Sequence, residues 1–375
     1  MPYSDSIYYL FHIATQKQSS PFFSAYALWF FYSIIDMSQN NGLGKVIAKN
    51  QLIIEDTLQS GDLTAVKHAN NQDWWIIVPA RYSNKYYKIL FTELGITEVT
   101  EQVIGDSTTY PSNGGGQGVF TPDGSLYVRY NPVNDIFLFD FDRSTGELSN
   151  YRHVPVSDGN AFVGGAAISP SSRYLYISAE TKFFQFDLQA PDIAASEVLL
   201  GEYDGFQSPF ATTFFSCQLA PDCKIYCTCS NSADRFHVVH YPDEPGLASG
   251  FEQHGLQLAT SNAFSIPNFP NYRLGSSDPT CVPTSVEEEK AAVAMVLSPN
   301  PASGWVRLAS EEGFPKGTAF SLYDLTGRQL RSWPLSAGGQ EQQFPLAGLA
   351  EGMYIWRVGA TGKWWQVGKV IVSKN

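Results

Sequence analysis

Basic residues are scarce in this chain of 375 residues, where 24 Lys and Arg face 36 Asp and Glu and leave a formal net charge of −12. Because binding to a phosphate backbone needs a basic face, this balance argues against a nucleic-acid partner. A hydrophobic run long enough to cross a membrane is missing as well. The longest, 21–35, is shorter than the ~20 residues of a helical span, and Ser24 and Ser33 interrupt it. We therefore predict no transmembrane segment.

The start of the chain also lacks a secretory signal. Residues 1–6 (MPYSDS) contain no basic residue, and the first long apolar run begins too late for a signal peptide. Cysteine is rare, and its odd count of five leaves at least one thiol outside any intrachain disulfide.

Aromatic residues, glycine and proline are abundant instead. Phe (25), Tyr (20) and Trp (8) make up 14% of the chain, beside 31 Gly and 22 Pro. Aromatic side chains favour strands, while Gly and Pro favour turns. The composition predicts an all-β protein, and the length predicts more than one domain.

A repeat with a period of about 50 residues runs through the first two thirds of the chain. Each of four units has a short strand, a turn and an aromatic strand, and the turns centre on Ala69, Pro122, Pro170 and Pro221. The aromatic strands are 74–78, 126–128, 174–177 and 224–227. A third strand ends near 92, 142, 187 or 240, and a fourth lies near 98–104, 148–153, 197–203 or 251–256. Four strands per unit are typical of a β-propeller blade.

An earlier unit, within residues 7–54, is predicted to be incomplete. Residues 7–11, 31–36 and 45–54 supply its second, third and fourth strands, with a loop from residue 21 leading into the third. Its first strand would lie before Met1. We therefore expect that the chain is truncated at its N-terminus, which would also account for the missing signal peptide. The prediction for 1–274 is a β-propeller-like array of about five four-stranded blades, the first incomplete.

Residues 275–292 read as an exposed linker, because the stretch is polar and holds two prolines and three consecutive glutamates. Beyond it, residues 293–375 show short strands separated by Gly, Pro and Asp turns. This pattern predicts a small Ig-like β-sandwich of seven strands. The expected strands are 293–297, 305–308, 319–323, 329–333, 342–346, 352–358 and 364–372.

Four motifs follow one another in this C-terminal module. They are Pro299-Asn300-Pro301, the hairpin 323–328, the approach to a strand at 349–354, and the final strand 368–372. Asp324 and Gly327 are expected to close a tight turn, with Arg328 opening the return strand. The module resembles the type A C-terminal sorting domain of type IX secretion cargo, the Por secretion tail family of Bacteroidota.

This resemblance implies export through the type IX secretion machinery to the medium or the outer-membrane cell surface. It also implies removal of the domain, by cleavage between about 284 and 293, or its exchange for a surface anchor. The alternative is an ordinary Ig-like appendage with no transport role. The residues that the resemblance marks as the sorting signal are Pro299, Asn300, Pro301, Asp324, Gly327, Arg328, Gly352, Tyr354, Gly368 and Lys369.

Residues 7–274 resemble the propeller-like surface proteins that are often fused to such tails, on segments 32–37, 63–70 and 268–274. That resemblance implies no activity. The segment 139–148 (FDFDRSTGEL) is similar to lactonase-type propellers, but over one blade edge alone.

Three groups of residues suggest metal sites, and each has a simpler interpretation. His237 and His240 lie three apart on an expected strand, so they point to opposite faces. Asp140, Asp142, Ser144 and Gly146 resemble a calcium loop, but Gly comes one position late and Tyr151 replaces the bidentate Glu. Asp142 is better placed to cap the turn 143–146.

Cys217, Cys223, Cys227 and Cys229 suggest zinc, but a hairpin turning at Pro221 would not bring four thiolates together tetrahedrally. Because an exported protein meets oxidising conditions, a Cys217–Cys227 or Cys217–Cys229 disulfide is the better expectation, with core thiols as the open alternative.

No nucleophile elbow, phosphate loop, zinc-protease helix or dinucleotide fingerprint occurs in the sequence. We therefore expect an exported binding or adhesion protein without catalysis or cofactor, which holds an unknown surface ligand (protein or glycan) through loops at one face of the propeller. The alternatives are a propeller hydrolase, either a lactonase or a glycan-active enzyme, and a truncated fragment without function. A cluster of His, Asp or Glu in the central channel would favour the hydrolase.

Overall fold

The computed structural model describes residues 2, 4–18, 24–108, 115–159, 161–266, 269–272, 274, 295–324, 328–360 and 363–373. The chain divides into two compact units, Met1–Pro283 and Thr284–Asn375. Apart from three short 3-10 helices, the regular elements of the described residues are strands. None of the described segments is a helix that could serve as a membrane span.

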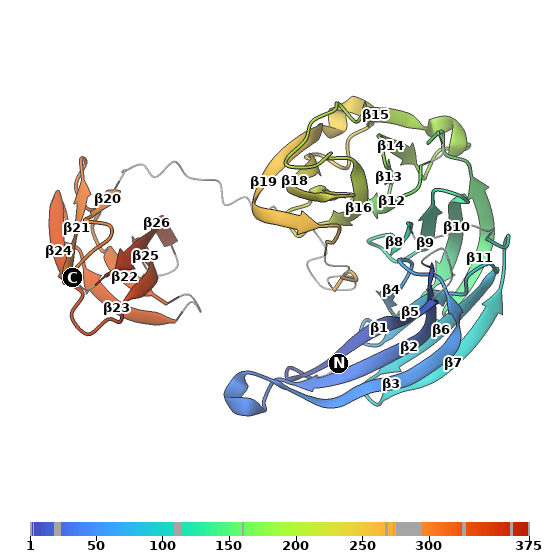
Figure 1. Ribbon diagram of the computed structural model, residues 1–375, viewed down its shortest axis with the longest axis horizontal. Coiled ribbons are helices and arrows are strands. Elements are labelled where there is room, and N and C mark those ends of the chain that lie inside the picture. Colours follow the sequence, from blue (N-terminus) through green and yellow to red (C-terminus); the bar gives the residue numbers. More distant parts are fainter. Residues whose placement is uncertain are drawn as a thin grey trace. The chain divides into compact units, whose positions relative to one another are not determined.

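The first unit contains five antiparallel sheets that follow one another in chain order (Figure 1). The first sheet comprises β1 Ile7–Gln18, β2 Ser24–Asp36 and β3 Lys45–Leu58. The second comprises β4 Thr64–Lys67, β5 Trp74–Pro79, β6 Lys85–Thr92 and β7 Gly95–Val103. The third comprises β8 Gln117–Phe120, β9 Leu126–Asn131, β10 Asp135–Asp142 and β11 Glu147–Val154. The fourth comprises β12 Gly164–Ile168, β13 Tyr174–Ala179, β14 Lys182–Asp187 and β15 Val198–Glu202. The fifth comprises β16 Phe214–Leu219, β17 Ile225–Cys229, β18 Ser232–Val239 and β19 Phe251–Ala263.

These sheets confirm the four repeat units and the three-stranded first unit. In each four-stranded sheet the first strand lies innermost and the last outermost (Figure 1). The turns after the innermost strands are alike: two positions beyond Ala69, Pro122, Pro170 and Pro221 the backbone has a positive φ. The residues there are Asn71, Gly124, Ser172 and Cys223, with φ of 61°, 73°, 63° and 67°. The same turn geometry is thus built four times, once with glycine and three times at some cost in strain.

The sequence predicted a loop from residue 21 and a strand only at 31–36, and this prediction is wrong for residues 24–30. β2 begins at Ser24 and pairs along its length with β1, which itself extends to Gln18. Ala27 and Phe30 are buried against the second sheet, beside Ile76 and Ile89. The strand is therefore longer than its local sequence suggests because the neighbouring sheet offers it an apolar surface.

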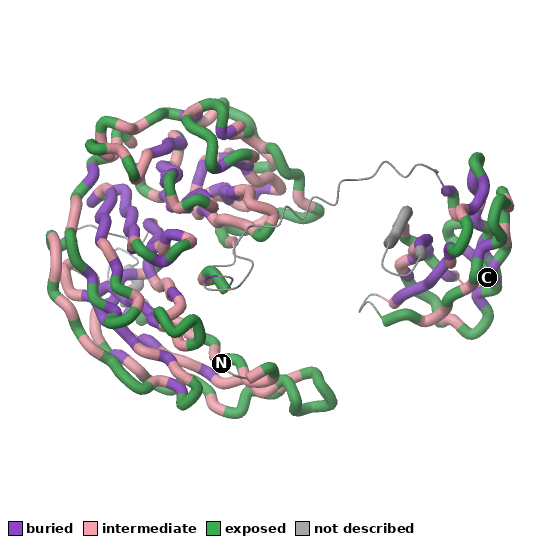
Figure 2. Tube along the Cα trace, turned by 180° about the vertical axis from the view of Figure 1, so that it is seen from behind, coloured by how far each residue is buried: buried purple, intermediate pink, exposed green. Residues whose placement is uncertain are grey.

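Consecutive sheets stack through four apolar clusters, one at each junction. Alternate residues of a middle strand serve both sides: Trp75 and Ile77 face the third sheet, while Ile76 and Val78 face the first. Burial on both faces explains why these strands are continuous apolar runs. Figure 2 shows the middle strands largely buried, whereas outermost strands such as β7 expose most of their residues.

The innermost strands β8, β12 and β16 converge so closely that one side chain joins all three. The Gln117 carboxamide donates to the Cys217 carbonyl (2.7 Å) and accepts from the Cys217 (3.1 Å) and Ala166 (3.3 Å) amides. A Cβ on Gly165 would lie 2.7 Å from both the Gln117 Oε1 and the Phe215 carbonyl oxygen. Glycine is required here because the backbones approach too closely for a side chain.

The second unit is a two-layer sandwich, and all seven expected strands are present. One sheet comprises β20 Met295–Ser298, β21 Trp305–Ser310 and β24 Glu341–Pro345. The other comprises β23 Gln329–Pro334, β22 Ala319–Tyr323, β25 Gly352–Ala360 and β26 Lys363–Val372. Phe320, Phe344 and Trp356 lie at the centre of the apolar core between them.

We predict that Gly165→Ala destabilises the first unit by about 1–3 kcal/mol, because the added methyl group must push two backbones and Gln117 apart. Urea unfolding followed by circular dichroism measures the loss. The control is Gly255→Ala, where the new Cβ meets the end of the flexible Glu252 side chain. Equal stability of the two variants would contradict the close packing of the inner strands.

Candidate functional site

Asn300 holds the last strand of the second unit. Its Nδ2 donates to the Lys369 carbonyl (3.0 Å), and its Oδ1 accepts from the Ile371 amide (2.9 Å). Two residues later, Ala302 continues the pairing with backbone hydrogen bonds to Ile371 and Ser373. The Asn300 carboxamide thus acts as one more peptide group of a short parallel strand, and Pro299 and Pro301 flank it in the exposed turn.

The predicted hairpin after β22 is closed by Asp324 and Arg328. The Arg328 amide donates to Asp324 Oδ1 (3.0 Å), and the Asp324 amide donates to the Arg328 carbonyl (3.0 Å). The guanidinium Nε also donates to Asp324 Oδ2 (3.1 Å), a contact that contributes little because Arg328 is exposed. Gly327 lies outside the described residues.

The remaining signal residues lie on the β25–β26 ladder. Gly368 is opposite Trp356, and a Cβ at this position would lie 2.5 Å from the indole ring, so only glycine fits. The Tyr354 hydroxyl donates to the Ala350 carbonyl (2.8 Å), and Gly352 opens β25 with φ of 152°. Lys369 has an exposed side chain and contributes its carbonyl to Asn300. The structure therefore brings the Asn300 turn, Gly352, Tyr354, Gly368 and Lys369 onto one ladder.

An apolar recess of about 520 Å³ lies in the first unit where β8, β12 and β16 enter their turns. Its walls are mainly apolar, and they include Phe120, Ile168 and Leu219. The same recess is bordered by Ile266 and by residues 269–272, among which Phe269 and Tyr272 are exposed at 64% and 61%. This recess has the size and apolar character of ligand pockets in proteins.

Asn271, Tyr272 and Leu274 are anchored to the second and third sheets. The Asn271 side chain donates to the Pro122 carbonyl (2.9 Å), and Tyr272 meets Trp74 edge-on with ring centroids 5.3 Å apart. Leu274 is buried in the apolar cluster between the second and third sheets. Residues 269–272 and Leu274 are therefore held against the second and third sheets, and the exposed rings of Phe269 and Tyr272 lie beside the recess.

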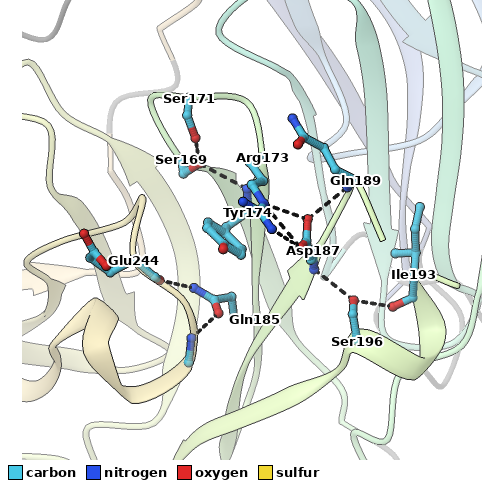
Figure 3. A network of polar contacts seen from close by, with 11 residues as sticks. Ser169, Ser171, Arg173, Tyr174, Gln185, Asp187, Gln189, Ile193, Ser196 and Glu244 are labelled. Atoms are coloured by element: carbon cyan, nitrogen blue, oxygen red, sulfur yellow. Dashed lines mark hydrogen bonds and ion pairs between the residues drawn. The ribbon is translucent and has the colours of Figure 1, made fainter. Parts of the chain in front are cut away.

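A second, polar groove of about 600 Å³ lies between the fourth and fifth sheets. Its polar groups mostly bind one another (Figure 3). Gln185 donates to the Glu244 carbonyl (2.8 Å) and accepts from the Gly246 amide (2.6 Å), which ties the β18–β19 connection to β14. Arg173 binds Asp187 through two nitrogens. This network acts as a joint between the sheets, because Gln185 links β14 of the fourth sheet to the β18–β19 connection of the fifth.

A chain of polar side chains beside the fifth sheet was not predicted from the sequence. The Thr212 hydroxyl lies 3.2 Å from His254 Nδ1, and His254 Nε2 lies 3.0 Å from Asp204. The order hydroxyl, imidazole, carboxylate is that of a nucleophile–base–acid relay. However, Thr212 is fully buried, and its hydroxyl also donates to the Phe206 carbonyl (3.1 Å). The chain therefore fastens the connection 203–213 to β19. Only the folded structure brings these three distant residues together.

Beside this chain, His237 and Cys229 form a second buried pair, 3.5 Å apart. The His254 amide donates to His237 Nδ1 (3.3 Å). Burial, together with the nearby His254, lowers the pKa of His237 to about 3. Burial and then Asp234 raise the pKa of Cys229 to about 12. Both groups are neutral near pH 7, so Cys229 is not an activated thiolate.

The structure places the other candidate metal ligands apart. His237 is buried, as expected, whereas His240 reaches Glu252 (2.7 Å) outside the sheet core. Asp142 caps the turn as predicted, by accepting from the Ser144 amide (2.8 Å), while Asp140 binds Asn150 and Arg152. Within the described ranges, no three His, Cys, Asp or Glu side chains are arranged to hold a metal ion.

Cys217 and Cys227 lie directly opposite each other in the β16–β17 ladder. Burial, with Cys217 close by, raises the pKa of the Cys227 thiol. The four described cysteines are free thiols in the structure, and Cys281 lies outside the described residues. Cys223 occupies the turn, as expected. The Cys217–Cys227 disulfide stays a prediction, which the facing positions keep geometrically reasonable.

Comparison with known proteins assigns the second unit. Residues 297–373 match the family described as a secretion system C-terminal sorting domain. No curated protein matches the chain.

Several solved structures are similar at low identity. A periplasmic gluconolactonase from Pseudomonas aeruginosa has a TM-score of 0.45 and 12% identity, with 98% of this chain and 97% of that chain covered. A functionally unknown protein from Desulfotomaculum acetoxidans has a TM-score of 0.39 and 11% identity, with 92% of this chain and 96% of that chain covered. A gluconolactonase from Xanthomonas campestris has a TM-score of 0.32 and 16% identity, with 54% of this chain and 65% of that chain covered. At these values the comparison assigns no activity to this chain.

We predict that Asn300→Ala weakens the attachment of β26 by about 1–3 kcal/mol, because two hydrogen bonds to the strand are lost. Hydrogen exchange of the full chain, read by mass spectrometry on peptides from β26, measures the effect as faster exchange. Lys369→Ala is the matched control, since that position contributes only its backbone carbonyl. Unchanged exchange in Asn300→Ala would show that the carboxamide does not hold the strand.

We also predict that the first unit loses stability in acid through His237. Because the unfolded imidazole takes up a proton below its ordinary pKa of 6.5 and the folded one does so only near 3, stability falls progressively between these values. The loss reaches about 3 kcal/mol at about pH 4. Urea unfolding at about pH 7.5 and about pH 4 measures it.

His237→Gln should show a smaller loss between the two pH values than the natural chain. His68→Gln, which replaces the histidine that follows β4, serves as the control for the removal of a histidine. An identical pH dependence of the natural chain and His237→Gln would refute the assignment.

Proposed function

We propose that the exported part of this chain is a non-catalytic binding module. Residues 297–373 match the secretion system C-terminal sorting domain, which indicates export by type IX secretion to the medium or the cell surface. The sorting domain engages the secretion machinery, and its Asn300 clamp keeps the terminal strand in place. The five-sheet unit is the cargo, and it binds its ligand at the apolar recess.

The apolar lining of the recess carries this proposal. Three innermost strands contribute side chains such as Phe120, Ile168 and Leu219, which can exclude water from an apolar group. Nearby polar side chains serve the fold instead: Gln117 binds Cys217, and Asn271 binds Pro122. Acid–base chemistry needs titratable groups aimed at the substrate, and these walls supply apolar surface instead.

An aromatic or aliphatic anchor on a protein ligand fits this surface. A ring that buries about 150–250 Å² gains roughly 4–6 kcal/mol, before the cost of association. One such anchor gives weak binding, so several contacts are needed for stable adhesion. Phe269 and Tyr272, exposed beside the recess, can add to the contact area.

The test uses the full chain and the fluorescent apolar probe anilinonaphthalene sulfonate. We expect saturable binding that Phe269→Ser weakens severalfold, because the ring lines the recess. Phe264→Ser is the matched control, since Phe264 is an exposed phenylalanine that does not line it. In parallel, glucono-δ-lactone should be hydrolysed no faster than in buffer. Hydrolysis faster than in buffer, or equal effects of the two substitutions, would overturn the proposal.

A further inference from the structure

A buried polar cluster lies between the second and third sheets, apart from the recess. Asp62 belongs to the connection between β3 and β4, Tyr86 to β6, and Tyr127 and Arg129 to one face of β9. All four side chains are almost wholly buried, with Asp62 at 0% and Arg129 at 1% exposure. A charged pair in such surroundings is rare unless its hydrogen bonds are complete.

The hydrogen bonds made within the chain are incomplete. The Arg129 Nε donates to Asp62 Oδ2. Among the described residues, the other carboxylate oxygen, Asp62 Oδ1, has no hydrogen-bond partner, and neither do Arg129 Nη1 and Nη2 or the hydroxyls of Tyr86 and Tyr127. The phenol of Tyr86 faces Arg129 from the second sheet, with its ring edge-on to Tyr127 at 6.2 Å.

Such unsatisfied groups are costly. Each buried donor or acceptor without a partner costs about 1–3 kcal/mol, and more when it is charged. Burial raises the pKa of Asp62, and the charge and hydrogen bond of Arg129 offset this only in part. The neighbouring backbone leaves room for the cluster, because Gly118 lies opposite Arg129 on β8 and has no side chain.

The mixture of unsatisfied donors and acceptors selects the class of ligand. An anion would accept from the guanidinium, but Asp62 would repel it and Oδ1 would keep no donor. A metal cation would satisfy Oδ1, but Arg129 would repel it. A water molecule both donates and accepts, so it can bind Asp62 Oδ1 and Arg129 at the same time.

We propose that this cluster is an internal water-binding site, in which at least one ordered water joins Asp62 Oδ1 to the Arg129 guanidinium and the Tyr127 hydroxyl. The site connects the strand junction at 59–63 to the third sheet. A polar joint then connects the chain between the first and second sheets to the third sheet, inside an otherwise apolar stack. The water is part of that joint.

A crystal structure of the full chain, at a resolution that shows ordered water, tests the proposal. We expect a density peak within hydrogen-bonding distance of both Asp62 Oδ1 and an Arg129 Nη. Bromide soaking separates the alternatives: an anomalous peak at this place would identify an anion site. Direct protein partners for both Nη atoms, without a peak, would also overturn the proposal.

Oxygen-17 magnetic relaxation dispersion provides a measurement in solution. The double variant Asp62→Leu with Arg129→Met should lose the signal of at least one long-lived water relative to the natural chain. Lys88→Met is the control, because Lys88 is buried at the same sheet junction but is paired with Glu147. An unchanged signal in the folded double variant would contradict the proposal, and the natural crystal structure decides the matter if that variant does not fold.

Discussion

Side-chain carboxamides that bind the backbone of another segment recur through the described chain. Gln117 and Gln102 each bind both the amide and the carbonyl of one residue, Cys217 and Leu148. Gln366 binds both backbone groups of Met295 in the same way. Gln185 and Asn300 each bind the carbonyl of one residue and the amide of another, in the β18–β19 connection and in β26. Because a carboxamide has the donor and acceptor of a peptide group, it satisfies backbone groups where sheets meet without continuous pairing. The junctions between sheets depend on this interaction.

The sorting domain shows the same constraint at its terminal strand. β26 lies at the edge of its sheet and would otherwise present unpaired backbone groups. Asn300 and Ala302 cover part of that edge, and Gly368 lets Trp356 lie flat against it. Several residues predicted to form the sorting signal therefore have structural roles at this strand.

In the first unit, the residues that pack the centre are separate from those that line the apolar recess. The converging innermost strands use glycine and Gln117 to fill their centre, and the apolar recess opens only where these strands enter their turns. The polar groove and the Thr212–His254–Asp204 chain look chemically active by composition, yet their donors and acceptors are committed to joints between segments. Composition of a site is thus a weaker guide to chemistry than the occupancy of its hydrogen bonds.

Local patterns in the sequence determined the four repeated turns, the seven strands of the sandwich and the order of the sorting motifs, because turn chemistry and strand alternation act over a few residues. The same information predicted the Asp142 cap and the opposite faces of His237 and His240. Only the tertiary structure decided that β2 begins at Ser24, since the neighbouring sheet buries Ala27 and Phe30. It alone brought Gln117 to Cys217, Asn300 to β26, and Asp62 to Arg129. These contacts join residues up to 100 positions apart, and their geometry depends on how whole sheets stack, which no short segment encodes.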